Sequence, residues 1–390
     1  MVKKFSLPFI LFFCCAFLAS AQQDSTTITG ISGRKVITTA VPFLTITPDA
    51  RAGGMGDVGA ATTPDANSIY WNPAKTVFNE EENGVSLSYT PWLGKIVNDM
   101  WIFYGSGFMK LTKEQAVSAS FRYFDLGEIF FTDDFGNEQG DFRPKELAIN
   151  VSYSRMLSQN LSVGLTGKFI HSNLIGNFTS STSGNLEAKP GNSVAADIGV
   201  YYNTALRGGN NSNIALAAVI SNIGSKITYS DENNKDFIPT NLRIGSAFTT
   251  NLDPYNKITI GLDFNKLMVP SPQPDGSEDD KSLLGGMFGS FADAEGGFSE
   301  ELKEITVSAG AEYWYNDTFA GRLGYFYESD EKGNRKYLTV GLGFRYQRFG
   351  IDFAYLVPQE QEHPLAETLR FSLLFNFGTK SVVEESVTDG

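Results

Sequence analysis

The feature that most constrains this chain is a two-residue alternation of apolar and polar side chains that recurs over most of its length. In the last such segment, Leu369 and Phe371 alternate with Arg370 and Ser372. Because side chains on a β-strand point alternately to opposite faces, this pattern predicts a strand with one apolar face. We predict fourteen strands, at residues 84–90, 99–109, 115–127, 145–156, 161–173, 192–203, 213–222, 237–249, 256–266, 304–315, 318–328, 336–347, 349–357 and 367–378.

The links between these strands favour a membrane barrel over a soluble β-sandwich, which does not need so many long strands. Links after odd-numbered strands are long, as at residues 267–303, whereas most others are tight, as at Asn316-Asp317. Strands of about ten residues in even number, with short turns in the periplasm, are typical of bacterial outer-membrane barrels. We predict an all-β fold, a 14-stranded antiparallel transmembrane β-barrel over residues 84–378, in the cell outer membrane with both termini periplasmic. Residues 379–390 would form an acidic periplasmic tail.

Composition excludes several other classes of protein. The net charge of −13 over 390 residues argues against a nucleic-acid partner, which requires a basic surface to replace phosphate counterions. An aromatic content of 13% argues against disorder. The mean hydropathy of −0.16 and the lack of any later apolar run of about 18 residues exclude a helical membrane protein.

The N-terminus has the pattern of a secretory signal peptide, residues 1–21. Lys3 and Lys4 precede an apolar run, and Ala19-Ser20-Ala21 is a small-x-small cleavage site. Both cysteines, Cys14 and Cys15, belong to this leader, and the bulky residues before Cys15 do not match a lipoprotein signal. The predicted mature chain therefore has no thiol for a disulfide or a metal site.

Glycines on the inward faces of the predicted strands indicate that another backbone lies close to the wall. These are Gly164, Gly245, Gly261, Gly310, Gly324, Gly341 and Gly343. Fourteen strands also enclose more space than their own side chains fill. We predict that residues 22–83 form an N-terminal hatch inside the barrel that plugs the lumen.

One motif in this hatch needs a separate interpretation. Gly54, Gly56 and Gly59 match the G-x-G-x-x-G dinucleotide fingerprint, which requires a preceding strand and a following helix. Thr62-Thr63-Pro64 ends the segment instead, so tight glycine turns are the favoured interpretation. The predicted hatch motif consists of Arg51, Gly53, Gly54, Gly56, Gly59, Asn72, Pro73 and Ala74, the last three forming an Asn-Pro turn.

Two long links carry apolar residues that are candidate contacts for cargo or translocon. Link 267–303 turns from acidic to apolar, and Leu284, Met287 and Phe288 have the spacing of one helix face. Such a cluster is either a binding surface or a cap folded over the barrel mouth. In link 128–144 a folded lid is favoured. The candidate contact residues are Phe130, Phe131, Phe135, Leu283, Leu284, Met287, Phe288, Phe291 and Phe298.

Catalytic and metal-binding patterns are missing from the sequence. The two histidines, His171 and His363, fall in different regions without an oriented partner, as a nucleophilic hydrolase would need. Asp133-Asp134 and Asp279-Asp280 lack the spacing of a calcium loop. We predict no catalytic residue, no metal site and no cofactor.

The segment Phe43–Ala74 resembles the hatch of the FadL family of outer-membrane proteins, through its start at Thr47–Gly56 and its Asn72-Pro73-Ala74 end. The run Pro48–Ala61 more specifically resembles the PorV (LptO) family of the type IX secretion system of Bacteroidetes. The likeness covers the leader, the hatch and the strand pattern. The fatty-acid-pocket residues of transporting members cannot be placed on this chain.

This resemblance implies a non-enzymatic function in protein secretion. Members bind the C-terminal signal domains of secreted cargo at a SprA/Sov-type translocon barrel. They deliver the cargo to a cell-surface attachment complex that contains the PorU sortase, PorQ and PorZ. Outer-membrane lipid would surround the barrel.

Two other functions remain as alternatives. A FadL-like channel for hydrophobic small molecules would have an apolar pocket beside the hatch and a lateral opening in the wall. An outer-membrane hydrolase would lose activity on replacement of His171 or His363, and nothing in the sequence supports direct catalysis.

Overall fold

A computed structural model gives the fold. It describes residues 36–377 except 95–96, 98, 133–137, 175–177, 181–185, 208–210, 230–234, 274–276 and 360–367. The predicted signal peptide, the start of the predicted hatch (22–35) and the predicted acidic tail lie outside the described residues.

Fourteen strands form one closed barrel, in which each strand pairs antiparallel with the next along the chain. They are β1 Asn83–Pro91, β2 Trp101–Thr112, β3 Gln115–Asp125, β6 Lys145–Met156, β7 Leu161–Asn173, β10 Gly191–Ala205, β11 Asn213–Gly224, β12 Asn241–Asn251, β13 Asn256–Leu267, β14 Ile305–Tyr315, β15 Phe319–Tyr327, β16 Lys336–Tyr346, β17 Phe349–Pro358 and β18 Leu369–Phe377. Pairing of β1 with β18 closes the ring, from Asn83 opposite Phe377 to Tyr89 opposite Phe371. The predicted 14-stranded antiparallel barrel is confirmed.

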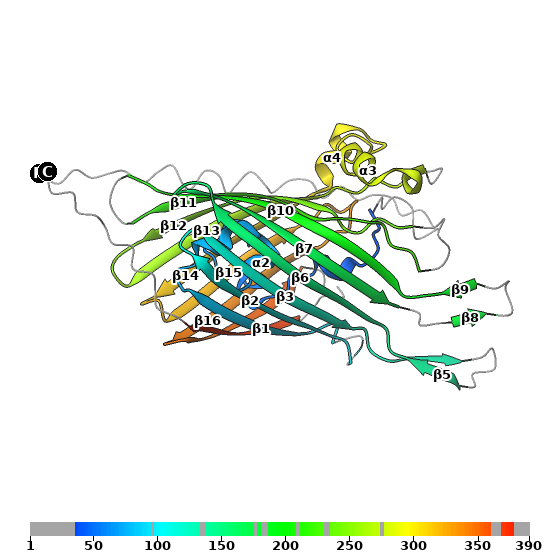
Figure 1. The fold of residues 1–390 in the computed structure, drawn as a ribbon, viewed down its shortest axis with the longest axis horizontal. Helices are drawn as coiled ribbons and strands as arrows, with labels where there is room; N and C mark the ends of the chain where they lie inside the picture. The colour runs from blue at the N-terminus through cyan, green and yellow to red at the C-terminus, as the bar shows by residue number, and fades with distance from the viewer. Residues whose placement is uncertain are drawn as a thin grey trace, which may run out of the picture. The chain divides into compact units, whose positions relative to one another are not determined.

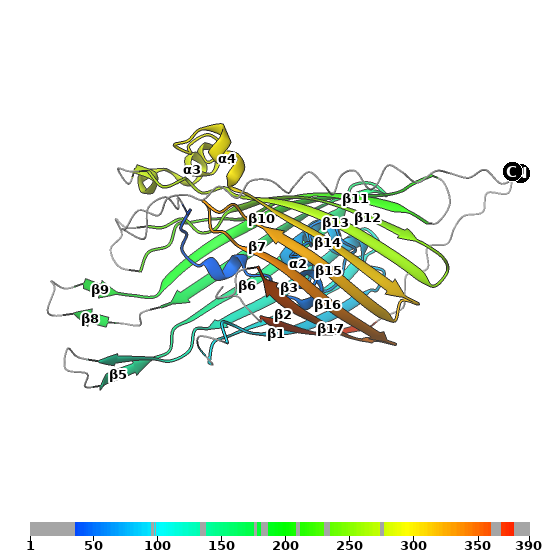
Figure 2. The ribbon, with the colours of Figure 1, turned by 180° about the vertical axis from the view of Figure 1, so that it is seen from behind.

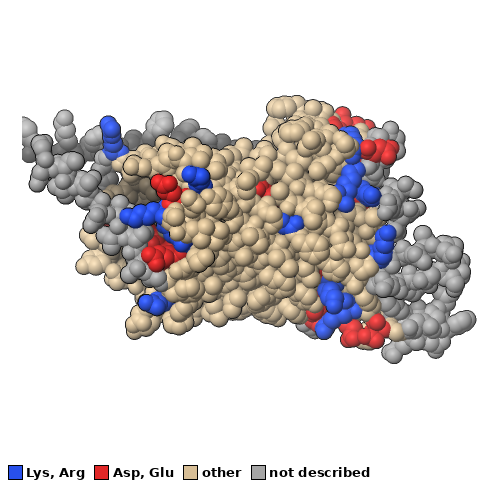
Figure 3. Space-filling view, in the orientation of Figure 1, with Lys and Arg blue, Asp and Glu red and all other residues tan. Residues whose placement is uncertain are grey.

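The alternation in sequence becomes an alternation of outer and inner faces. In β18, Phe371 and Leu373 are 43% and 56% exposed, whereas Arg370 and Ser372 are buried. Apolar side chains therefore cover the outside of the barrel and small or polar ones face the inside. On the side seen in Figure 3, charged residues gather toward the two ends and the middle is almost free of them. Such a belt suits the hydrocarbon core of a membrane.

Short turns join the strands at one end of the barrel and long links at the other. Asn316 and Asp317 both have positive φ (51° and 49°), the conformation that a two-residue hairpin turn requires. The long links carry two hairpins, β4 Ile129–Thr132 with β5 Glu138–Phe142, and β8 Phe178–Ser180 with β9 Leu186–Ala188. They also carry η3 Ser277–Asp280, α3 Leu283–Gly289 and α4 Phe298–Lys303. Figures 1 and 2 show α3 and α4 at the same end as these hairpins.

Residues before β1 contact the inward-facing side of the strands, and we call residues 36–79 the N-terminal segment. Its short helices are η1 Pro42–Thr45, α1 Ala50–Gly53, α2 Ser68–Trp71 and η2 Pro73–Phe78. Near its start, the Ala40 amide donates to the carbonyl of Phe237 in a long link (2.9 Å). Near its end, the Ser162 hydroxyl, beside a short turn, donates to the carbonyl of Ala74 (2.6 Å). The segment thus runs from the long-link end to the short-turn end (Figure 1).

Several inward glycines lie directly against this segment. A Cβ atom at Gly324 would stand 2.0 Å from the Gly56 amide nitrogen, and one at Gly164 would stand 2.4 Å from the Ala74 nitrogen. No side chain fits at these distances. The prediction that inward glycines mark close approach by another backbone is confirmed at these positions.

Candidate functional site

Arg51 ties the N-terminal segment to the barrel wall through a buried ionic network. Its Nε and Nη2 donate to the two carboxylate oxygens of Glu312 (2.9 and 2.7 Å), and its Nη1 donates to Asp65 (3.0 Å). Glu312 also accepts from Arg322, which donates in turn to Asp352 (both pairs within 2.9 Å). Because the groups are buried and bidentate, removal of one member leaves an unpaired charge in a poorly solvated site.

A second set of polar contacts joins the two halves of the segment. Asp49 caps α1 by accepting from the Ala52 amide (2.9 Å) and also accepts from the Trp71 indole (2.7 Å). Burial, followed by the neighbouring Asp65 carboxylate, raises the pKa of Asp49 to about 6. Lys75 donates to the carbonyl of Gly59 (2.6 Å), and burial lowers the pKa of Lys75 to about 8.

The remaining motif residues are all buried and pack against one another or against the wall. A Cβ at Gly59 would stand 2.0 Å from the Trp71 ring, and a Cβ at Gly54 would stand 3.0 Å from Gly341. Asn72 holds the Asn-Pro turn by accepting from the Ala74 amide (3.0 Å) and donates to the carbonyl of Val200 (3.1 Å). Gly53, Gly56 and Pro73 lie in the same packed segment. No βαβ unit surrounds the glycines in the described part of the chain.

The link between β13 and β14 presents most of its predicted contact residues to the outside. Leu284, Phe288, Phe291 and Phe298 are 60%, 65%, 43% and 77% exposed. Met287 is buried instead, and Leu283 is half-buried. The predicted helix is present as α3, but its apolar residues do not form one buried face.

A cluster of buried ion pairs holds this link in place. Lys266 of β13 pairs with Glu301 and Glu304 (2.9 and 2.5 Å). Lys332, in the next long link, pairs with Glu300 and Glu304 (2.8 and 2.9 Å). This cluster was not predicted from the sequence, although a lysine at an outward position of an otherwise apolar strand is a signal for it.

The same cluster positions the β13–β14 link relative to the barrel wall. Asn265 and Leu267 line the interior, so Lys266 between them points outward and meets α4 there. In Figures 1 and 2, α3 and α4 lie beside the outer wall. This position favours a binding surface over a cap folded over the barrel mouth, and that interpretation stays a prediction.

The other candidate link behaves differently from its prediction. Phe130 is 60% exposed in β4, so it does not pack beneath a folded lid, and that interpretation is wrong for this residue. Phe131 lies in the same strand, and Phe135 lies outside the described residues. The strand β4 pairs with β5 in a two-stranded sheet separate from the barrel.

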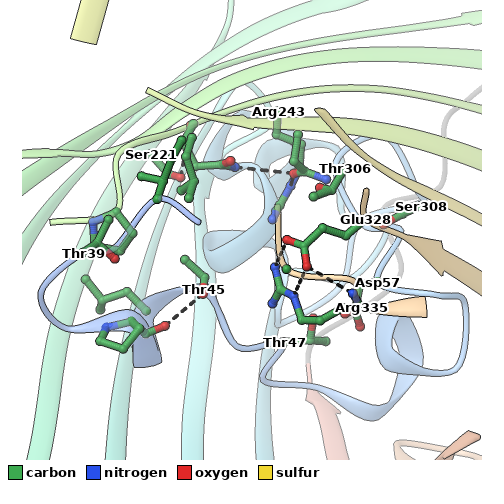
Figure 4. Close-up of a pocket in the computed structure, with 18 of the residues that line it drawn as sticks. Thr39, Thr45, Thr47, Asp57, Ser221, Arg243, Thr306, Ser308, Glu328 and Arg335 are labelled. Carbon is green, nitrogen blue, oxygen red and sulfur yellow. Dashed lines mark hydrogen bonds and ion pairs between the residues drawn. The ribbon is translucent and has the colours of Figure 1, made fainter. Parts of the chain in front are cut away.

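A cavity of about 400 Å³ lies between the start of the N-terminal segment and the inner wall (Figure 4). Its charged lining residues are Asp57, Lys168, Arg243, Glu304, Glu328, Lys332 and Arg335. Ser221, Asn241 and Thr306 add hydroxyl and amide groups. Apolar residues complete the lining, among them Val36, Ile37, Leu44, Leu267 and Phe326. The cavity is therefore mixed in character rather than wholly apolar.

The described residues include one of the two histidines and no metal-binding cluster. His171 lies on β7, and its Nδ1 is 2.8 Å from Oδ1 of Asn192 on β10. His363 is outside the described residues. Within the described ranges no group of three or more His, Cys, Asp or Glu side chains is placed to hold a metal ion. No helix in those ranges has the length and apolar character needed to cross a bilayer.

The family model described as "Type IX secretion system protein PorV" matches residues 30–274. No curated protein sequence matches the chain. Similar solved structures include the CymD monoaromatic hydrocarbon channel (12% identity, TM-score 0.50, covering 85% of this chain and 98% of that one). A second is the Ralstonia pickettii toluene transporter TbuX (14% identity, TM-score 0.48, covering 84% of this chain and 98% of that one). A third is a Pseudomonas aeruginosa FadL homologue (12% identity, TM-score 0.44, covering 85% of this chain and 99% of that one).

The likeness to CymD, at 12% identity, shows the fold alone. Together with the closed barrel and its uncharged belt, it defines this chain as an outer-membrane β-barrel protein. The family match covers more than half of the sequence. The chain belongs to the PorV family and is an outer-membrane component of the type IX secretion system.

Proposed function

We propose that the protein is a non-enzymatic cargo receptor of the type IX secretion system. In this proposal it binds the C-terminal signal domains of secreted proteins at a SprA/Sov-type translocon barrel. It then delivers them to the attachment complex that contains the PorU sortase, PorQ and PorZ. The exposed apolar residues on α3 and α4 are the observation that carries the proposal, because they provide a surface for another protein outside the barrel.

These exposed residues lie in a link and not on a barrel strand, where exposed apolar side chains form the outer belt. Phe298 and Phe288 are large, and both are more than half exposed. Clusters of exposed apolar side chains in surface links often mark interaction sites, and aromatic residues are enriched among those that contribute most to binding. The α3–α4 region, residues 283–303, therefore supports docking of a protein partner.

The support beneath this surface suits a receptor as well. The buried pairs of Lys266 and Lys332 with Glu300, Glu301 and Glu304 restrain the region before any partner arrives. A preorganised surface loses less conformational entropy on binding than a flexible one does. The link can thus present its apolar side chains at low entropic cost.

We also propose that the N-terminal segment acts as a hatch that closes the lumen, and that the short turns and both termini face the periplasm. The Arg51–Glu312 network and the glycine contacts support a fixed position of the segment rather than an open conduit. Cargo would then be held outside the barrel. The cavity lining includes seven charged residues, which a channel for hydrophobic molecules does not require.

Paired substitutions on α3 test the proposal. The variant Leu284→Ser/Phe288→Ser should assemble as a folded barrel, because both side chains are exposed. It should lose co-purification with cargo and with the translocon, and secreted proteins should no longer reach the cell surface. The measurements are pull-down from membranes in mild detergent and surface labelling of cargo.

The matched control is Leu252→Ser/Tyr255→Ser at a short turn, where the two side chains are 57% and 61% exposed. This control should secrete normally. Normal cargo capture and delivery by the α3 variant, at a wild-type level of folded barrel, would refute the proposed contact.

A further inference from the structure

We propose that the cavity beside the N-terminal segment binds a small hydroxylated anion, a carboxylate or a phosphate, with the Arg243 guanidinium as its anchor. The cavity holds about 400 Å³, within the range of small-molecule pockets. None of the exposed apolar residues of the proposed cargo surface lines the cavity, although Glu304 and Lys332 of the ion-pair cluster do.

Arg243 differs from the other cations that line this cavity. Lys168 pairs with Asp197 (2.9 Å), Arg335 pairs with Glu328 (2.7 Å), and Lys332 pairs with glutamates of α4. Among the residues that the structure describes, no carboxylate lies within ion-pair distance of Arg243. The buried Asp263 carboxylate on the neighbouring strand interacts electrostatically with Arg243 from beyond that distance. The terminal nitrogens of Arg243 therefore have no close anionic partner among the described residues, and a bound anion would supply one.

The contacts of Arg243 hold it in one orientation. Its Nε donates to Asn265 Oδ1 (2.6 Å), and its guanidinium carbon lies over the Trp71 ring (4.6 Å to the centroid). These contacts use one donor and one face of the group. The terminal nitrogens donate to no partner among the described residues, and their planar edge matches the paired oxygens of a carboxylate or phosphate. Figure 4 shows Arg243 beside Thr306 at the cavity.

The polar lining groups near the anchor favour a hydroxylated ligand over a purely apolar one. Ser221, Asn241 and Thr306 supply hydroxyl and amide groups around the anchor. An apolar ligand would displace the water bound to these polar groups and would offer no hydrogen bonds in its place. Each hydrogen bond lost in this way weakens binding. A ligand with several hydroxyls can satisfy them.

Titration calorimetry on the full-length protein in detergent tests the site with three probes: glucose 6-phosphate, gluconate and decanoate. We expect saturable binding of at least one of the two hydroxylated anions, more tightly than decanoate. Arg243→Gln should weaken that binding at least about tenfold, the loss expected for a charge-assisted hydrogen bond. The control Arg348→Gln makes the same charge change at a short turn and should bind as the wild type does.

A second variant guards against a folding defect in Arg243→Gln, with folding checked by heat-modifiable mobility on gels. Thr306→Trp keeps the anchor but fills the cavity, and it should also abolish binding. The proposal is overturned if the wild type binds neither hydroxylated anion, if decanoate binds more tightly than both, or if a folded variant of either kind binds as the wild type does.

Discussion

At the scale of single residues, the inward glycines determine how closely the N-terminal segment approaches the wall. Gly324 of β15 faces the backbone of Met55 and Gly56, whereas Gly321 of the same strand faces outward. A Cβ at Gly324 would meet backbone atoms at 2.0 Å, and a Cβ at Gly321 would meet nothing within 4 Å. The same substitution therefore has different physical consequences at two positions only three residues apart.

Gly324→Ala should destabilise the folded barrel, because a backbone contact cannot be relieved by rotation of a side chain. Overpacking of this kind costs roughly 1–3 kcal/mol. The measurement is the free energy of unfolding by urea, followed by tryptophan fluorescence. Gly321→Ala is the control and should change that free energy by less than about 0.5 kcal/mol. Equal effects of the two substitutions would contradict a tight contact at Gly324.

The sequence allowed the motif residues of the N-terminal segment to be predicted, but not the barrel residues that they contact. Arg51 belongs to the motif noted from the sequence, but Glu312, its partner in the wall, was not identified. Alternation along β14 shows that Glu312 faces inward, and it carries no information on which residue it meets across the barrel. A contact between residues 261 positions apart requires the three-dimensional packing.

At the scale of elements, the α3–α4 region depends on two lysines for its position. Lys332 is 4% exposed and pairs with two glutamates, whereas Lys303 of α4 pairs with Glu331 on the surface, where the two side chains are 42% and 52% exposed. Buried pairs are costly to break on one side, and exposed pairs contribute about 0–1 kcal/mol. The buried pairs of Lys332, and not the exposed pair of Lys303, should therefore stabilise the position of the α3–α4 region.

Lys332→Met should loosen the region by leaving Glu300 and Glu304 with one fewer cation. The expected result is faster hydrogen–deuterium exchange across residues 283–303, without a change in the barrel strands. Lys303→Met removes the same charge next to the region and should leave exchange there nearly unchanged. If both variants exchange alike, the buried cluster does not anchor the region.

The elements of the barrel were largely predictable, and those of the long links were not. Each predicted strand corresponds to an observed one, since alternation is a local property of the sequence. The predicted start of the eighth strand at residue 237 is wrong, because β12 begins at Asn241. The hairpins β4–β5 and β8–β9 lack clear alternation. The exposure of Phe288 and the burial of Met287 depend on what α3 packs against, which helical spacing does not reveal.

At the scale of the whole molecule, the N-terminal segment contacts strands on several sides of the barrel. It meets β7 at Gly164, β13 at Gly261 and β16 at Gly341. A ring of fourteen strands without such contents would leave a wide water-filled passage. Contacts on several sides of the barrel should therefore obstruct the flow of ions through it.

In planar lipid bilayers the wild type should carry little ion current, and a variant lacking residues 22–78 should form open pores with stepwise currents. The deletion spares every barrel strand, so folding can be checked by gel mobility. Deletion of Leu283–Phe291, outside the wall, should leave the current as in the wild type. Steady large currents through the wild type would argue against a closed lumen.

The long separations between the N-terminal segment and its partners also bear on biogenesis. Ala50 bonds to Ser372, 322 residues later, and Gly56 bonds to Thr339, 283 residues later. The part of the segment made first by the ribosome must therefore wait for the last strands before it can acquire its native neighbours. Contacts so distant in sequence form slowly. Any chaperone that escorts the newly exported chain thus has to shield its beginning until its end has arrived.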